Sequence, residues 1–157
     1  MGTSPPFNEA GKPLAGGAQL SPLAPLILLA GDVLILLAFV IVGQRDHNLV
    51  DPVHPVLGVL ARTAEFAGPW LIAGWLLGAF KGPGDHEGRP YVVSLLARSL
   101  NAWLVAAPLG ILARAFDLGH VTVIRIFMVI TLSLGGALLL GWRLAFALIW
   151  GRLARKK

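Results

Sequence analysis

One carboxylate inside a long apolar stretch is the group in this sequence most able to do chemistry. Residues 25–47 read PLILLAGDVLILLAFVIVGQRDH, and Asp32 lies near the middle. The part 25–42 nearly supplies the about 20 apolar residues that a bilayer-spanning helix needs. An ionised aspartate at the centre of a lone membrane helix costs roughly 2.5–3.5 kcal/mol. We therefore expect Asp32 to face the rest of the protein, where it is either protonated or paired with a cation.

Two arginines could supply that cation, since Arg98 and Arg143 both fall inside later apolar stretches. At a rise of about 1.5 Å per residue, Asp32 lies about 15 Å from the start of its helix, and Arg143 lies about 10 Å from the end of the last helix. A long arginine side chain can cover that difference. Asp32, Arg98 and Arg143 are predicted to form one membrane-embedded polar site. We favour a buried structural ion pair with Arg143; the alternative is a proton or ion relay.

A second polar cluster is predicted at the opposite ends of the helices, on the external side. Arg62 and Glu65 are three residues apart and can pair on one helix face. Imidazole and carboxylate groups suit zinc, but the histidine spacing matches no ligand motif, so we expect no metal. The members of this external cluster are Arg45, His47, Arg62, Glu65, Arg114 and His120.

Other chemistries find little support in the sequence. Cysteine is absent, which excludes disulfides, thiolate metal sites and cysteine nucleophiles. There is no G-x-S-x-G, no H-E-x-x-H and no glycine-rich phosphate loop between a strand and a helix. The net charge of +5 comes from basic residues at the ends of apolar runs and not from one stripe, so a nucleic-acid partner is not expected. We predict a protein without enzymatic activity and without a cofactor.

Composition indicates a membrane protein, because 56% of the residues are hydrophobic and only 13% are charged, against roughly 25% charged in soluble domains. Four membrane helices are predicted, over residues 25–42, 56–80, 91–114 and 121–150. Their short connections favour an all-α, up-down-up-down transmembrane bundle. We divide the chain into a flexible tail at 1–21, a four-span membrane domain at 22–150 and a basic tail at 151–157.

Small residues at four-residue spacing predict where the helices approach one another. Gly74 and Gly78 form a G-x-x-x-G pair in the second predicted helix. Ser133, Ala137 and Gly141 form a similar ridge in the fourth. Because small residues let membrane helices come close, we predict that the second and fourth helices make the closest contact.

Basic residues are distributed unequally between the two sides of the predicted bundle. With Arg143 left out because it lies too deep in the membrane to count, the side with both termini has eight, against four on the other side, which are Arg45, Arg62, Arg114 and Arg125. By the positive-inside rule we expect both termini to lie in the cytoplasm. The membrane that we expect is the plasma membrane. Lipid is the expected partner, together with either further copies of the chain or a larger membrane complex.

A set of short patterns is spread over most of the chain. Its members are Asp32, Gly43 and His47, Thr63 ahead of Pro69, Gly74-Trp75, Pro108-x-Gly110 with Arg114, and Gly141-Trp142-Arg143. In order and spacing they resemble a family of small prokaryotic integral membrane proteins known only as domain of unknown function 3054. The resemblance covers about residues 30–143 and implies a four-helix membrane architecture, with no activity, cofactor or catalytic residue to carry over. The charged pair Arg62 and Glu65 departs from the family pattern.

From these observations we expect a structural or accessory subunit that acts through helix–helix contacts. The alternative is a minimal channel or proton-coupled carrier in which Asp32 titrates.

Overall fold

The computed structural model describes residues 23–46, 52–81, 91–117, 119 and 125–154. This part of the chain is helical and contains no strand, which confirms the all-α prediction. Its elements in order are α1 (Leu23–Asp46), α2 (Pro55–Leu76), α3 (Tyr91–Asp117), α4 (Arg125–Ile130), η2 (Thr131–Gly135) and α5 (Gly136–Ala154). The last three form one continuous helical rod, so the described residues contain four long helical units.

Each of these four units is long and apolar enough to cross a membrane. Their mean hydropathies are 2.8 for α1, 1.2 for α2, 1.5 for α3 and 1.8 for the rod Arg125–Trp150. Lengths of 22 to 27 residues match the roughly 30 Å hydrocarbon thickness of a bilayer. The chain therefore has the character of a multi-pass membrane protein. The up-down-up-down order of the crossings stays a prediction.

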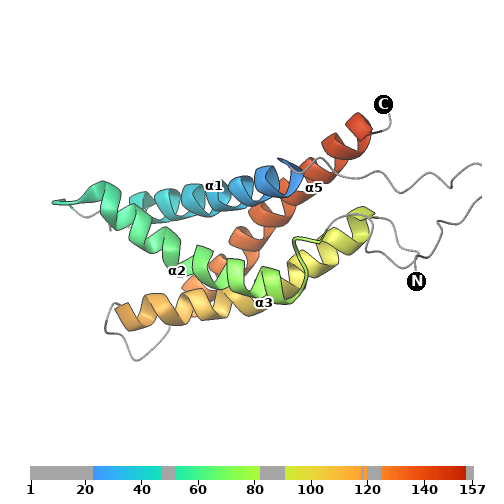
Figure 1. Cartoon of the computed structure of the whole chain (residues 1–157). Coiled ribbons are helices and arrows are strands. Elements are labelled where there is room, and N and C mark those ends of the chain that lie inside the picture. Colours follow the sequence, from blue (N-terminus) through green and yellow to red (C-terminus); the bar gives the residue numbers. More distant parts are fainter. Residues whose placement is uncertain (1–22, 47–51, 82–90, 118, 120–124, 155–157) are drawn as a thin grey trace, which may run out of the picture.

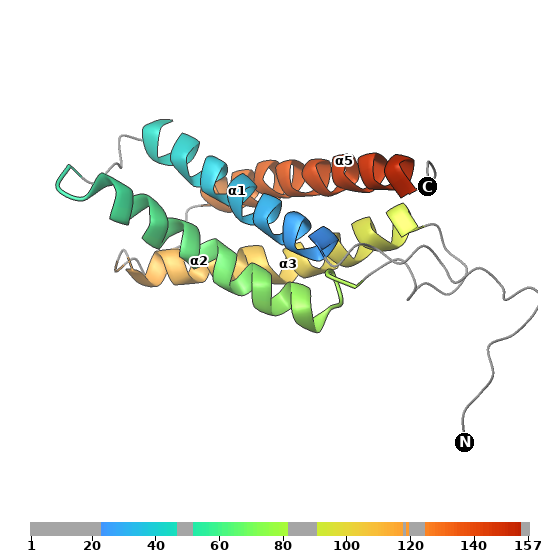
Figure 2. The same cartoon turned by 45° about the horizontal axis from the view of Figure 1, so that its top comes forward.

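The four long helical units pack in a ring, in the order α1, α2, α3 and α5. α2 lies along α3, and α1 contacts both α2 and α5 (Figure 1). α5 also packs against α3, and Figure 2 shows both helices running along the length of the bundle. α3 is the most enclosed of the four units, because 44% of the residues in its most apolar 18-residue stretch are buried. The interior of the bundle is therefore built chiefly around α3.

The end of α2 differs from the predicted end of the second helix. The helix was predicted to continue to residue 80, but it ends at Leu76 because Gly78 adopts a left-handed conformation with φ of 70°. The amide of Ala79 donates to the carbonyl of Gly74, and the amide of Gly78 donates to that of Trp75, which is the Schellman arrangement that stops a helix. The chain then turns back, and the Phe80 ring lies against Gly74.

The predicted close contact between the second and fourth helices is therefore wrong. Gly74 makes room for a ring of its own turn, and Gly78 serves the backbone conformation. On the other helix, Ser133, Ala137 and Gly141 are all exposed, and a Cβ atom on Gly141 would meet nothing within 4 Å. The pattern was ambiguous because glycine serves both close packing and positive φ.

A π-helical turn, η2, interrupts the last rod where the sequence predicts a plain α-helix. Trp103 of α3 lies against it, and its indole N–H donates to the carbonyl of Leu132 at 3.0 Å. The ring fills the space that Cβ atoms on Gly135 and Gly136 would occupy, each at 2.8 Å. A widened turn frees carbonyl groups from the regular ladder, and here one of them satisfies a buried tryptophan.

The tightest contact between α1 and α5 is made by Gly31 and Trp142. A Cβ atom on Gly31 would lie only 2.0 Å from the indole ring, and the indole N–H donates to the carbonyl of Leu28 at 3.3 Å. The next residues along each helix are Asp32 and Arg143. Glycine at position 31 thus sets the distance at which the two charged side chains meet.

We predict that Gly31→Ala destabilises the protein by about 1–3 kcal/mol, because its methyl group overlaps the Trp142 ring. The free energy of unfolding can be measured in mixed micelles by titration with a denaturing detergent, followed by circular dichroism. Gly43→Ala is the matched control: it lies in the same helix, where a Cβ atom meets nothing within 4 Å. Equal midpoints for the two variants would contradict the role given to Gly31.

Candidate functional site

The centre of the bundle holds an ion pair between Asp32 of α1 and Arg143 of the last rod. The guanidinium Nε donates to Oδ1 at 3.0 Å, and Nη2 donates to Oδ2 at 2.5 Å. Both side chains are completely buried. This two-point contact is the strongest geometry available to an arginine and a carboxylate. It confirms neither a relay nor a catalytic role, but it identifies Arg143 as the partner of Asp32.

The remaining donors of Arg143 reach two other elements. Nη1 donates to the carbonyl of Ala79 at 2.7 Å and to Oγ of Ser99 at 2.9 Å. The Ser99 hydroxyl in turn donates to the carbonyl of Leu95 at 2.5 Å. On the other side of the pair, the Trp70 indole N–H donates to Oδ2 of Asp32 at 3.2 Å. The network therefore joins all four long helical units and the turn after α2.

Two aromatic rings complete the surroundings of the guanidinium. Its Cζ atom lies 4.8 Å from the centroid of Trp70 and 5.0 Å from that of Phe80. The ring faces attract the cation electrostatically, an interaction that is strongest where water is excluded. The early end of α2 is what brings Phe80 back to this position.

Apolar clusters close the network along the bundle in both directions. Leu28, one turn before Asp32, belongs to a cluster with Leu95 and Phe146. Leu36, one turn after Asp32, belongs to a larger cluster with Phe66 and Trp103. Along α1, both directions from Asp32 therefore lead into one of these apolar clusters. In this conformation the arrangement holds the helices together and isolates the charges.

Sequence reasoning missed three of the groups in the network. Trp70 carries a usable signal, because a buried indole usually finds a hydrogen-bond partner. Ser99 directly follows the predicted member Arg98 in the sequence but was not itself predicted. The Ala79 carbonyl has no side-chain signature at all. Arg98, predicted as a member, lies half-buried beside Ser99.

The external cluster forms in part. Arg62 pairs with Glu65 at 2.6 Å and also contacts the carboxylate of Asp117. Arg114 lies 3.9 Å from both of these acidic residues. Arg62 and Glu65 thus pair within α2, as their i,i+3 spacing predicted. The contacts with Asp117 and Arg114 link the first half of α2 to the end of α3 and were not predicted. Asp117 was not predicted as a member, although it follows Arg114 by one helical turn.

The other predicted members of that cluster are placed differently. Arg45 is exposed near the end of α1, and His47 and His120 lie outside the described residues. No group of three histidine or acidic side chains within the described ranges could hold a metal ion.

Some buried polar atoms near this end have no hydrogen-bond partner among the described residues. They include Oε2 of Glu65, Nη1 of Arg114, Oε1 of Gln44 and Oγ1 of Thr131. The Glu65 and Arg114 side chains are 13% and 12% exposed. The 3.9 Å between Nη1 of Arg114 and Oε1 of Glu65 is longer than a direct hydrogen bond. This end of the bundle is therefore more polar inside than the end beyond Leu28.

The helices and the network define a class: a four-helix protein of multi-pass membrane character, held together by a buried arginine–aspartate pair. A family model described as "Protein of unknown function (DUF3054)" matches residues 29–146, and the chain belongs to this family. The matched region contains both Asp32 and Arg143. No curated protein and no solved structure matches the chain.

We predict that Asp32→Asn and Arg143→Gln each lower the free energy of unfolding by about 3–5 kcal/mol, because each leaves one partner of a buried pair without its counter-charge. The double variant should cost less than the two single losses together, since it removes both charges. Detergent titration followed by circular dichroism measures all three.

Arg45→Gln serves as the control, because Arg45 is an exposed arginine outside the network. Strictly additive losses, or an Asp32→Asn variant as stable as the control, would show that the pair does not stabilise the fold.

Proposed function

We propose that the protein is a non-enzymatic structural or accessory subunit of a membrane, which acts through contacts of its outer helical faces. The observation that supports this proposal best is the use of the interior polar site by the chain itself. The hydrogen bonds of Asp32 and Arg143 join one helical element to another or to the turn after α2. Such a site gives the bundle a fixed shape and leaves the outer faces for interaction.

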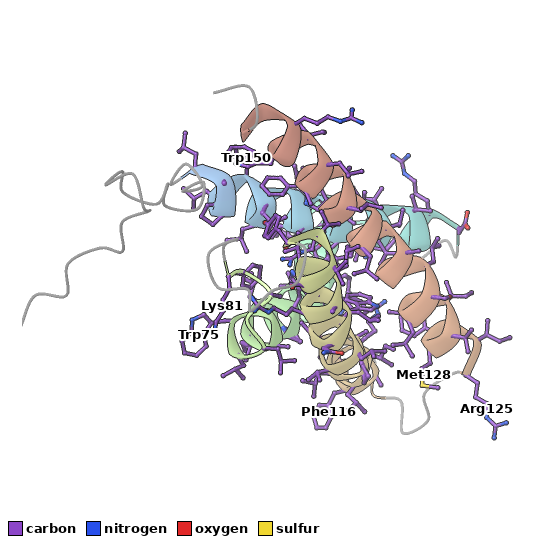
Figure 3. The ribbon with its side chains drawn as sticks, turned by 90° about the vertical axis from the view of Figure 1, so that its right-hand side faces the viewer. Trp75, Lys81, Phe116, Arg125, Met128 and Trp150 are labelled. Carbon is purple, nitrogen blue, oxygen red and sulfur yellow. The ribbon has the colours of Figure 1, made fainter. Side chains whose placement is uncertain are left out.

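The outer faces are apolar, as expected of a protein that lies in lipid. Trp75 near the end of α2 and Phe116 near the end of α3 are 75% and 92% exposed, and both point away from the bundle (Figure 3). Aromatic residues favour the interfaces of a bilayer. We place the protein in the plasma membrane with both termini in the cytoplasm, on the basis of the eight-to-four distribution of basic residues.

A second function, a minimal channel or proton-coupled carrier, has one observation in its favour. The buried polar atoms of Gln44, Glu65, Arg114 and Thr131 come from four different helical elements and lie toward the external end. Between them and Asp32 stands the apolar cluster that contains Leu36 and Phe66. A carrier would have to open that cluster to bring solvent to the ion pair.

The proposed orientation predicts on which side of the membrane a reporter fused to each segment is active. A reporter fused after Lys157, and one inserted within 82–90, should be active on the cytoplasmic side only. A reporter inserted within 47–51 should be active on the external side only. The reverse pattern would overturn the orientation without affecting the fold.

Photo-crosslinking in native membranes tests the subunit role. A photoreactive residue replaces Leu60 of α2 or Ala137 of α5, which are exposed on different helices, or Ala106, which is buried as a control. We expect one exposed position to yield a discrete adduct of constant mass and the buried position to yield none. Adducts spread over every exposed face in proportion to protein abundance would contradict the proposal.

Proteoliposomes separate the two functions. If the protein is a structural subunit, liposomes that contain it should lose a pH gradient no faster than empty liposomes. Rapid loss of the gradient that disappears in a folded Asp32→Asn variant would favour the carrier instead.

A further inference from the structure

A shallow apolar groove runs along the outside of the bundle between α3 and α5. Its volume is about 440 Å³, and its walls are Val93, Leu96 and Leu100 of α3 facing Leu140 and Leu144 of α5, with Ala97 and Gly141 between them. The last two residues are small, so the groove exists because no side chain fills it. A Cβ atom on Gly141 would have nothing within 4 Å.

The groove approaches one end of the bundle. Val93 is only two residues from Tyr91, where α3 begins. On α5, Arg152 follows Gly141 by about three helical turns, so it returns to the same face of the helix. Leu144 and the exposed Leu148 lie along this face between them. The apolar groove and an exposed arginine thus lie in line, with the arginine at the end of the helix.

The charge at this end of the bundle is positive in the described residues. The exposed acidic groups Asp46 and Asp117 are at the ends of α1 and α3 that lie on the opposite side in Figure 1. The first turn of α3 adds the positive end of its helix dipole. An anionic group beside Arg152 would therefore meet favourable charges and no described carboxylate.

We propose that the α3–α5 groove binds one acyl chain of an anionic phospholipid, whose phosphate headgroup contacts Arg152. This inference rests on the proposed location of the protein in a membrane. The apolar walls of the groove can contact a hydrocarbon chain, and the basic residue beyond its end can pair with the anionic headgroup. With the termini in the cytoplasm, the site faces the leaflet where anionic lipids concentrate in many membranes.

A second copy of the chain suits the surface less well. Two-fold packing of α5 on α5 in parallel would bring the Arg152 side chains of both copies to the same end of the interface. Like charges at one end oppose association, whereas an anionic lipid neutralises them. The charge at the end of the groove thus selects the lipid over the protein.

Native mass spectrometry of the full chain tests this site. The protein is reconstituted in nanodiscs of phosphatidylcholine with a minor fraction of phosphatidylglycerol, and the lipids retained on release are identified. The test variants are Gly141→Leu, which fills the groove, and Arg152→Gln. Their matched controls are Gly43→Leu, a helical glycine with equally open space around it, and Arg45→Gln, an exposed arginine at the other end.

We expect the wild type and both controls to retain phosphatidylglycerol selectively. Gly141→Leu should lose the retained lipid, and Arg152→Gln should bind it about fivefold more weakly, the effect of one basic residue near an anionic headgroup. Retention that is equal in Gly141→Leu, equal for the two lipids, or replaced by a second copy of the chain overturns the proposal. Detection of the chain in the soluble fraction of cells would instead overturn the membrane function itself.

Discussion

A charged arginine and a charged aspartate cannot remain inside an apolar bundle unless almost every hydrogen-bonding group they carry is satisfied. Removing each ion from water costs several kcal/mol, and attraction within the pair repays this only with good geometry and further hydrogen bonds. Much of the architecture meets that requirement. Gly31 lets α1 approach Trp142 of α5, so that Asp32 and Arg143 meet at two points. The early stop of α2 presents the Ala79 carbonyl, and α3 supplies Ser99.

The same network explains how four apolar helices acquire one defined register. In lipid there is little hydrophobic force between helices, because the surrounding hydrocarbon is as apolar as leucine. Packing contacts then distinguish only weakly between neighbouring registers. A guanidinium with directed bonds to three other elements is satisfied in a single arrangement, and sliding any helix by one turn, about 5.4 Å, would break at least one bond. A wholly apolar core could be equally stable, so the pair contributes chiefly a unique geometry.

The features that could be predicted from the sequence are those for which any other arrangement would cost a large free energy. A carboxylate in hydrocarbon must find a partner, and the depth of Arg143 along its helix identified that partner correctly. The four helical units follow from apolar length, and Pro55 begins α2, where a missing N–H costs nothing. What could not be predicted depends on small energies and on backbone groups. The spacing of Gly78 does not indicate whether this residue ends a helix or packs against one. Every residue has a backbone carbonyl, so the sequence does not indicate that the carbonyl of Ala79 accepts a hydrogen bond. The π-turn at Thr131–Gly135 depends on where Trp103 arrives from another helix.

Since the interior polar site is occupied by its own chain, selectivity toward other molecules must come from the outer surface. Large exposed aliphatic residues on that surface carry little information in a bilayer, because lipid solvates them all alike. Departures from this uniform surface do carry information, and two such departures lie toward the ends of the bundle in the described part of the chain. One is the α3–α5 groove, where the small residue Gly141 leaves space unfilled near the basic end of α5. The other is the partly buried cluster of Arg62, Glu65 and Arg114, where charge lies close to the outer surface. Each of these features places charged groups next to apolar surface toward one end of the bundle, and charged groups offer a partner directed contacts that aliphatic side chains lack.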